Sequence, residues 1–385
     1  MRFPGFEGEW DSQRLGDFVD RVTRRNRNLE AKRPLTISAQ YGLIDQTAFF
    51  KKTVASQDIS NYYLLYNGEF AYNKSYSSEY PWGAVKRLDL YDKGVLSSLY
   101  ICFKPNDNNE SDFLVHYFES TKWYQGVADI AGEGARNHGL LNISIPDYFN
   151  TQHFLPGRKE QRRIADFLNL VEKRIVVQSK VIEDLRSLFD VICQKLYSSN
   201  EKKEWHEFKY ADLLTISNER NSRLQYTNVL SASQEYGMVE RGELNIDIKY
   251  DATSIKNYKI VHPNEYVIHL RSFQGGFAYS DKTGICSPAY TILVPNGKLI
   301  PAFLKYYFTS TQFINSLRIV TYGIRDGRSI SVEEFLQLKI SIPTISEQNY
   351  ILSVMQLWEE KIRIEECHLS NLQKQKQYLL RQMFI

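Results

Sequence analysis

The sequence predicts an α+β fold with an internal pseudo-twofold repeat, in which two mixed α/β domains are joined by two long helices. Two observations support this prediction: the first half of the chain maps onto the second, and each half ends in a heptad pattern of apolar residues. Two such helices can pair as an antiparallel coiled coil. The predicted order is a domain over residues 1–155, a spacer helix over 156–200, a second domain over 201–342 and a second spacer helix over 343–385.

The repeat runs in order along both halves, with a shift of 195 at its start that falls to 187 at its end. Ordered matches along two entire halves are difficult to attribute to chance, so each half is predicted to be one copy of the same unit. Representative pairs are Glu9-Trp10 with Glu204-Trp205, Asn26 with Asn221, Gly94 with Gly284, Tyr100 with Tyr290, Pro156 with Pro343, and Glu160-Gln161 with Glu347-Gln348.

The two domains contain short aromatic and β-branched runs that turn residues interrupt, as where Asn67-Gly68 follows the run from Tyr62 to Tyr66. Such runs are typical of strands. Helical stretches are expected near Ser111 to Tyr124 and Pro301 to Leu317. The two copies have matching residues at positions expected to be structural, and the residues between those positions differ. This is expected of one scaffold that presents different loops.

The two long helices are predicted from apolar residues that recur at steps of four and three. Each helix of about 36 residues would be about 54 Å long. The first seam comprises Ile164, Leu168, Val171, Ile175, Gln178, Ile182, Leu185, Phe189, Ile192 and Leu196. The second comprises Ile351, Met355, Trp358, Ile362, Glu365, Leu369, Leu372, Leu379 and Met383.

A heptad seam alone is also compatible with homodimerisation, but two matched seams in one chain favour an internal pair. If that pair is antiparallel, the polar seam residues Gln178 and Glu365 are expected to lie close together. A buried polar layer can fix the register of two helices at some cost in stability. An antiparallel pair would also place the two domains at opposite ends of a rod.

The composition fits a soluble protein. No run of about 18 apolar residues occurs, so we expect neither a membrane span nor any membrane partner. The N-terminus lacks the apolar core of a signal peptide. The four cysteines, Cys102, Cys193, Cys286 and Cys367, are far apart and form no CxxC pair, which favours a reducing, cytoplasmic location.

Several loops place basic or amide side chains next to glycines, in a composition that suits contact with DNA. Arginine can bond guanine in bidentate fashion, glutamine and asparagine can bond adenine, and glycine allows close approach to phosphate. For any single arginine the alternative is a solvated surface charge. The candidate DNA-binding residues are Arg24, Arg25, Arg136, Asn137, Arg271, Gln274, Arg325 and Arg328. Because the net charge is only +3, a partner is expected to supply much of the electrostatic attraction to DNA.

The motifs of DNA-processing enzymes are missing from the sequence. It has no Pro-Pro dipeptide for a methyltransferase target-base motif and no GxxxxGK[ST] phosphate loop. The seven histidines are scattered without metal-ligand spacing. We therefore predict no catalytic residue, no metal site and no cofactor bound by this chain.

The start of each predicted helix carries the most distinctive motif. Residues 155–168 read LPGRKEQRRIADFL and residues 342–351 read IPTISEQNYI. This resembles the Pro…Glu-Gln-x-x-Ile-Ala…Leu opening of the conserved helices in type I restriction–modification specificity subunits. The Glu-Trp…Leu-Gly-Asp start of the first half is similar to that family too. The second copy departs from the pattern, with Asn349-Tyr350 before Ile351 and no alanine after it.

The resemblance covers nearly the whole chain, and it implies a division of labour. Each domain would be a target recognition domain that reads one half of a bipartite, asymmetric site in double-stranded DNA. The helices would set the gap between the halves and dock two modification (methyltransferase) subunits, which methylate adenine. Two restriction (motor–nuclease) subunits would complete the complex. S-adenosylmethionine, ATP and Mg would belong to these partners, not to this chain.

Two other classes of function remain open from the sequence. The first is a divergent methyltransferase or nuclease, which would bind S-adenosylmethionine or cut DNA by itself. The second is a coiled-coil DNA-associated or scaffolding protein without sequence preference. Selection of binding sites from random DNA separates the classes, because only a specificity subunit yields a gapped motif.

Overall fold

The computed structural model describes residues 2–38, 41–50, 58–77, 80–131, 139–198, 204–233, 236–244, 255–269, 276–322 and 329–385. The chain divides into two compact units. Unit 1 comprises Met1–Ser179 and His368–Ile385, and unit 2 comprises Lys180–Cys367. We call the globular part of unit 1 domain A (residues 2–155) and that of unit 2 domain B (residues 204–342).

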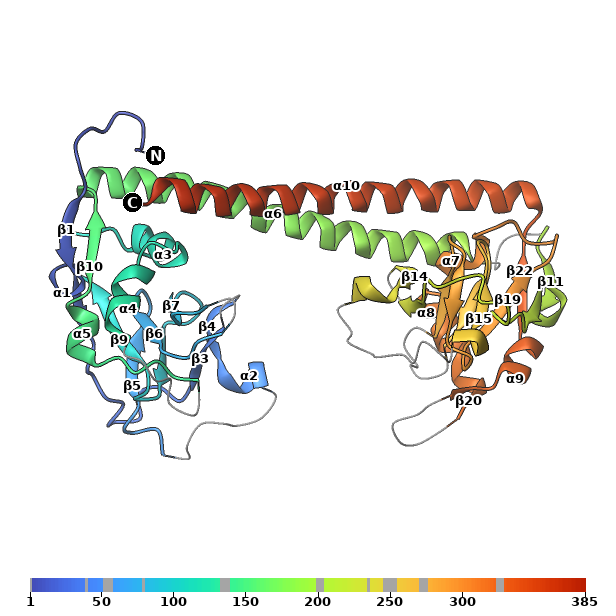
Figure 1. The fold of residues 1–385 in the computed structure, drawn as a ribbon, viewed down its shortest axis with the longest axis horizontal. Coiled ribbons are helices and arrows are strands. Elements are labelled where there is room, and N and C mark those ends of the chain that lie inside the picture. The colour runs from blue at the N-terminus through green and yellow to red at the C-terminus, as the bar shows by residue number, and fades with distance from the viewer. Residues whose placement is uncertain are drawn as a thin grey trace. The chain divides into compact units, whose positions relative to one another are not determined.

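Domain A is built around a four-stranded antiparallel sheet with three two-stranded pairs beside it (Figure 1). The sheet has the order β2 (Val19–Arg21), β9 (Ile101–Pro105), β6 (Phe70–Asn73), β7 (Ala84–Arg87). The pairs are β1 (Asp11–Arg14) with β10 (Gln152–Leu155), β3 (Leu35–Ser38) with β4 (Gly42–Asp45), and β5 (Tyr63–Tyr66) with β8 (Lys93–Leu96). The helices are α1 (Leu15–Phe18), α2 (Gln46–Phe50), α3 (Ser111–Glu119), α4 (Tyr124–Ile130) and α5 (Ile145–Phe149).

Domain B repeats the strand pairing of domain A and adds one two-stranded pair. Its four-stranded sheet has the order β12 (Leu214–Ser217), β19 (Thr291–Pro295), β16 (Tyr266–Ile268), β17 (Phe277–Tyr279). Its pairs are β11 (His206–Lys209) with β22 (Lys339–Ile342), β13 (Leu230–Ser233) with β14 (Gly237–Glu240), β15 (Lys259–Val261) with β18 (Gly284–Cys286), and the additional β20 (Thr321–Tyr322) with β21 (Ser329–Ile330). The helices are α7 (Phe303–Tyr307), α8 (Thr311–Ser316), α9 (Val332–Gln337), η1 (Tyr210–Asp212), η2 (Arg241–Leu244), η3 (Ile255–Asn257) and η4 (Leu317–Val320). The internal repeat is therefore confirmed.

Each of the two predicted helical stretches is broken by a serine. The Ser120 hydroxyl donates to the carbonyl of Tyr117 at 2.6 Å, and the Ser310 hydroxyl donates to that of Tyr307 at 2.7 Å. A serine that bonds the preceding turn competes with the helical hydrogen bonds, so the chain turns there before α4 and α8. Ser120 and Ser310 are 190 residues apart, as the repeat requires.

Aromatic side chains fill both cores. In domain A, Tyr72 stacks on Tyr148 with ring centres 4.5 Å apart. In domain B, the rings of Phe277, Phe308 and Phe313 form a cluster. The ring centre of Phe308 lies 4.7 Å from those of Phe277 and Phe313, which are 4.9 Å apart. This packing accounts for the many tyrosines and phenylalanines that the composition shows.

The two long helices are α6 (Arg158–Leu196) and α10 (Ile345–Met383). Each unit contains one end of α6 and the opposite end of α10, so the helices are antiparallel within each unit (Figure 1). In unit 1, Lys376 forms an ion pair with Glu172. In unit 2, Arg186 forms one with Glu366 at 2.6 Å. The antiparallel pairing that the sequence predicts is thus present.

The seam residues of both helices face inward. Ile164, Leu168, Val171, Ile182, Ile351, Met355 and Leu372 are buried, and Ile175, Gln178, Leu185, Trp358, Ile362, Glu365 and Leu369 are half-buried. The proximity of Gln178 and Glu365 joins residues of different units and stays a prediction. Within the described residues, no helix combines the length and hydrophobicity that a membrane crossing requires.

Candidate nucleic-acid interface

Two of the predicted DNA-binding residues, Arg24 and Arg25, lie side by side between β2 and β3. Arg24 donates from Nη2 to both carboxylate oxygens of Glu69, at 2.8 and 2.7 Å, and its guanidinium lies 4.1 Å from the centre of the Tyr66 ring. Arg25 donates to the carbonyl of Asn61 at 2.6 Å. Both arginines are half-buried, so they stiffen the domain while adding positive charge to its surface.

The other predicted DNA-binding residues lie outside the described part of the chain and stay predictions. The structure therefore brings together only the adjacent pair Arg24 and Arg25. The residues outside the description are Arg136, Asn137, Arg271, Gln274, Arg325 and Arg328.

The turn after β5 of domain A and the matching turn of domain B contain the same backbone contact. In domain A, Glu69 is buried and accepts a hydrogen bond from the backbone N–H of Tyr66 at 2.8 Å. In domain B, Glu265 accepts the equivalent bond from the N–H of His262 at 2.7 Å. The scaffold contact is the same in both copies.

The residue opposite this turn differs in the two copies. Arg24 of domain A is replaced by Glu219 of domain B, whose carboxylate lies 3.1 Å from Nε2 of His262. Burial raises the pKa of Glu265, and the neighbouring Glu219 raises it further, although the N–H of His262 opposes both. At matched positions, domain A therefore has an arginine that stacks on a tyrosine ring, and domain B has a glutamate beside a histidine ring.

The loop that directly follows Arg24 and Arg25 is also duplicated. In domain A, the Asn26 side chain donates to the carbonyl of Ala31 at 2.8 Å and accepts from its N–H at 3.0 Å. In domain B, Asn221 makes the same two bonds with Tyr226, at 2.8 and 3.2 Å. The match of Asn26 with Asn221 in the repeat was the sequence signal that could have found these loops.

The Pro…Glu-Gln motif spans the start of each long helix and joins it to its domain by hydrogen bonds. Gln161 is buried, donates to the carbonyls of Pro156 and Asn109 at 2.9 Å each, and accepts from the N–H of Glu110 at 3.0 Å. In the Asn109 contact the acceptor is the side-chain oxygen. Gln348 repeats this with the carbonyls of Pro343 and Lys298 and the N–H of Ile300. The motif thus fixes each helix start to its domain.

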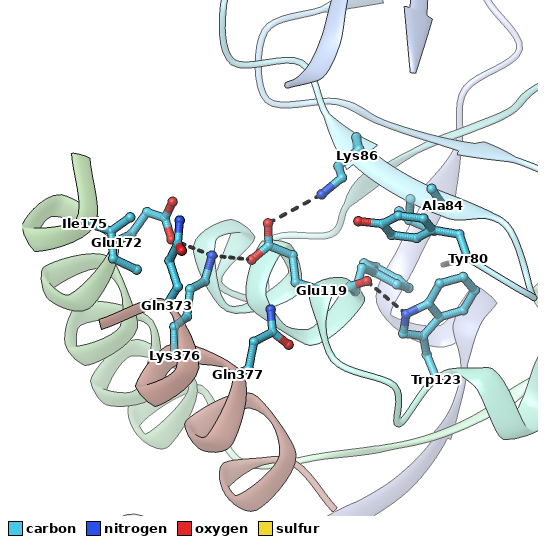
Figure 2. A pocket seen from close by; sticks show the side chains of 12 residues that line it. Tyr80, Ala84, Lys86, Glu119, Trp123, Glu172, Ile175, Gln373, Lys376 and Gln377 are labelled. Carbon is cyan, nitrogen blue, oxygen red and sulfur yellow. Dashed lines mark hydrogen bonds and ion pairs between the residues drawn. The ribbon is translucent and has the colours of Figure 1, made fainter. Parts of the chain in front are cut away.

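A chain of charges attaches α10 to domain A at the edge of a pocket of about 350 Å³ (Figure 2). Glu119 lies 3.5 Å from Nζ of Lys86 and 2.9 Å from Nζ of Lys376, which also pairs with Glu172. Burial alone would raise the pKa of Glu119, but the charges of Lys376 and Lys86 outweigh burial and hold it below its ordinary value. These ion pairs attach α10 to α3 of domain A and to α6 within unit 1.

Comparisons with known proteins agree with this architecture. A solved chain described as "Structural basis underlying complex assembly and conformational transition of the type I R-M system" has a TM-score of 0.62 at 15% identity, with 97% of each chain covered. The crystal structure of the type I restriction–modification S subunit from M. genitalium has a TM-score of 0.50 at 14% identity, covering 100% of this chain and 99% of that one. No curated protein sequence matches this chain significantly.

A match in sequence covers much of the second half of the chain. Residues 202–374 match the family model described as the type I restriction modification DNA specificity domain. This part of the chain is therefore a type I restriction–modification DNA specificity domain. The matched residues cover domain B and most of α10, and domain A has the same strand order as domain B. Members of this family are non-catalytic subunits that recognise DNA.

Among the described residues, no three His, Cys, Asp or Glu side chains gather in a group that could hold a metal ion. The buried titratable side chains of unit 1 have structural neighbours instead. His116, for example, bonds Oδ1 of Asn169 on α6 through Nε2 at 2.8 Å, and burial lowers its pKa. The charged clusters near α6 and α10 are therefore explained by attachment of the domain to the helices.

Proposed function

We propose that this specificity subunit reads a bipartite, asymmetric site in double-stranded DNA, with one half-site for each domain. Residues 1–155 and 201–342 would be the two target recognition domains, and residues 156–200 and 343–385 the spacer helices that set the gap. The observation that supports the proposal is that both domains have the same strand order but different side chains at matched positions, such as Arg24 and Glu219. Unlike surfaces on one scaffold predict unlike half-sites.

A duplicated apolar stripe on the helices supports docking of two modification subunits. Leu170 on α6 and Leu357 on α10 are 63% and 73% exposed. Apolar side chains that gather on a surface mark a contact with a partner, whereas single ones need no explanation. The stripe is repeated at the shift of 187: Leu170 with Leu357, Val177 with Ile364, and Val191 with Tyr378, all exposed. Unit 1 carries Leu170, Val177 and Tyr378, whereas unit 2 carries Leu357, Ile364 and Val191. Two equivalent surfaces would bind two copies of one partner.

The chemistry of the complex would reside in the partners. The modification subunits would hold S-adenosylmethionine, and two restriction subunits bound through them would use ATP and Mg. The chain itself would act in the cytoplasm, in keeping with the free thiols of Cys102, Cys193, Cys286 and Cys367.

Selection of binding sites from random duplex DNA tests the proposal, with the full chain and its modification subunit mixed at one to two. We expect a motif of two unlike half-sites separated by a fixed gap. A continuous motif would contradict the two-reader proposal, and the absence of any motif would favour a scaffolding role. Binding of S-adenosylmethionine to the chain alone is measured in parallel and is expected to be absent.

A further inference from the structure

Leu29 and Leu224 share an unusual backbone conformation at matched places in the repeat. Their φ angles are +51° and +53°, in the left-handed region that leucine rarely adopts. Both side chains are about half exposed, at 50% and 55%. Each copy thus presents an apolar side chain to solvent from a backbone that glycine or asparagine would adopt with less strain.

The two loops that carry these leucines are fixed by the same bonds. The backbone N–H of Leu29 donates to the carbonyl of Asn26 at 2.9 Å, and that of Leu224 donates to the carbonyl of Asn221 at 2.9 Å. The Asn26 and Asn221 side chains close the loops on Ala31 and Tyr226, as described above. Both asparagines are buried. The leucines are therefore held on rigid loops.

The packing of the domains does not explain the leucines. A half-exposed side chain contributes little to the core, and a residue in a sparsely populated region costs about 1 kcal/mol or more. The asparagine clamp would form equally well around glycine at either position. A feature that adds strain, exposes apolar surface and occurs in both copies indicates a contact with something outside the domain.

The charges around both loops favour an anionic partner. Arg27 and Lys32 are exposed beside Leu29, and Arg220 and Arg223 are exposed beside Leu224. The first loop contains one carboxylate, Glu30, which accepts hydrogen bonds from Tyr66 and Lys93; the second loop has Gln225 at that position. An apolar tip between basic side chains suits a nucleic acid, because the faces of the bases and the thymine methyl group offer apolar contacts and the backbone is negative.

We propose that Leu29 and Leu224 contact the bases of the two half-sites, one leucine in each, while the basic side chains beside them bind phosphates. This inference rests on the proposed function, and it adds residues that the choice of arginine and amide side chains had missed. An apolar side chain can read the methyl group of thymine or enter between base pairs. The duplicated position gives each domain one such contact.

The location of the first loop separates it from the stripe proposed for the modification subunits. Arg24, just before the loop, accepts a backbone hydrogen bond from Leu64 of β5 at 2.9 Å. Figure 1 shows β5 at the opposite end of domain A from α6 and α10. The first loop adjoins β5, so it lies away from the side of domain A that meets the long helices, which favours DNA over the modification subunit as its partner.

The test uses the complete chain with its modification subunit and the duplex obtained by site selection. Leu29→Gly and Leu224→Gly remove the side chain and fit the positive φ angle. Each is expected to lower DNA affinity about fivefold or more, and to leave the melting temperature unchanged or higher. Leu99→Ala, which removes a similarly exposed leucine (60%) of domain A, is the matched control with unchanged affinity.

Hydroxyl-radical footprints assign the contacts. Leu29→Gly is expected to weaken protection in one half-site only, and Leu224→Gly in the other. A fall in melting temperature would instead assign the leucines to the fold, and loss of the modification subunit from the purified complex would assign them to that partner; either result overturns the inference. Unchanged affinity in both variants also overturns it. If the wild-type complex selects no gapped motif, the proposed function fails first, so the two failures are distinguishable.

Discussion

Phe384 packs edge to face against Trp10, with the two ring centres 6.3 Å apart, so the last turn of the chain closes into the core of domain A. The ring also lies 5.4 Å from that of Phe113. At the shift of 187, Phe384 corresponds to Tyr197, which is buried against Phe303 in domain B. Each long helix therefore ends in an aromatic residue that completes the core at the end of the helix.

Phe384→Ala is expected to destabilise domain A by about 3 kcal/mol, because it removes a buried ring and leaves a cavity between Trp10 and Phe113. Thermal unfolding followed by tryptophan fluorescence measures the change. Ile385→Ala is the control, since Ile385 is half exposed and should alter stability by less than about 0.5 kcal/mol. Equal effects of the two variants would contradict the closing role of Phe384.

Gln161→Leu is expected to cost about 2 to 3 kcal/mol, because it leaves the N–H of Glu110 and the carbonyl of Pro156 without their partner in a buried site. Gln348→Leu should cost a similar amount in unit 2. Urea unfolding measures both. Gln125→Leu, at an exposed position on α4, should be nearly neutral. A neutral Gln161→Leu would show that the motif serves a contact outside the chain instead.

The sequence predicted the repeat, the long helices and their antiparallel pairing because these depend on regular spacing. The motif glutamines could be located but not explained, since their partners Asn109 and Lys298 are about 50 residues away. Arg24 was selected by residue type alone, and its bonds to Glu69 depend on tertiary packing. The conformation of Leu29 could not be foreseen, because leucine has no propensity for positive φ.

Lys376→Met is expected to destabilise unit 1 by about 2 kcal/mol at pH 7, because Glu119 and Glu172 then lose their shared cation. The folded-state pKa of Glu119 is below its ordinary value, so its contribution is present above about pH 4.5 and is lost as the pH falls through the folded pKa. The difference between wild type and Lys376→Met should therefore shrink between pH 5 and pH 3.

Unfolding of both proteins in urea across this pH range provides the measurement. Lys374→Met, an exposed lysine two residues away on α10, is the control and should show no such pH dependence. A difference that stays constant with pH would mean that Lys376 acts by packing its aliphatic chain and not by its charge.

Leu170→Asp and Leu357→Asp are each expected to reduce the number of bound modification subunits from two to one, and the double variant should bind none. A buried charge opposite an apolar partner surface costs several kcal/mol. Sedimentation of the mixed complex measures the stoichiometry. Val176→Asp is the control, because Val176 is as exposed as the stripe but has Arg363 at the equivalent place in α10. Retention of two subunits by the double variant would exclude the stripe as the docking surface.

Lengthening both long helices by one heptad is expected to widen the gap of the DNA motif by about three base pairs, since seven residues add about 10.5 Å and each base pair about 3.4 Å. The insertions belong between Ser179 and Lys180 and between Cys367 and His368, where the two compact units meet in the sequence. Insertion at both places preserves the heptad phase and the antiparallel register, whereas insertion in α6 alone shifts one seam against the other and should abolish binding. Site selection with the lengthened subunit measures the outcome. Unchanged half-sites with a wider gap would support the helices as the spacer, and an unchanged gap would contradict it.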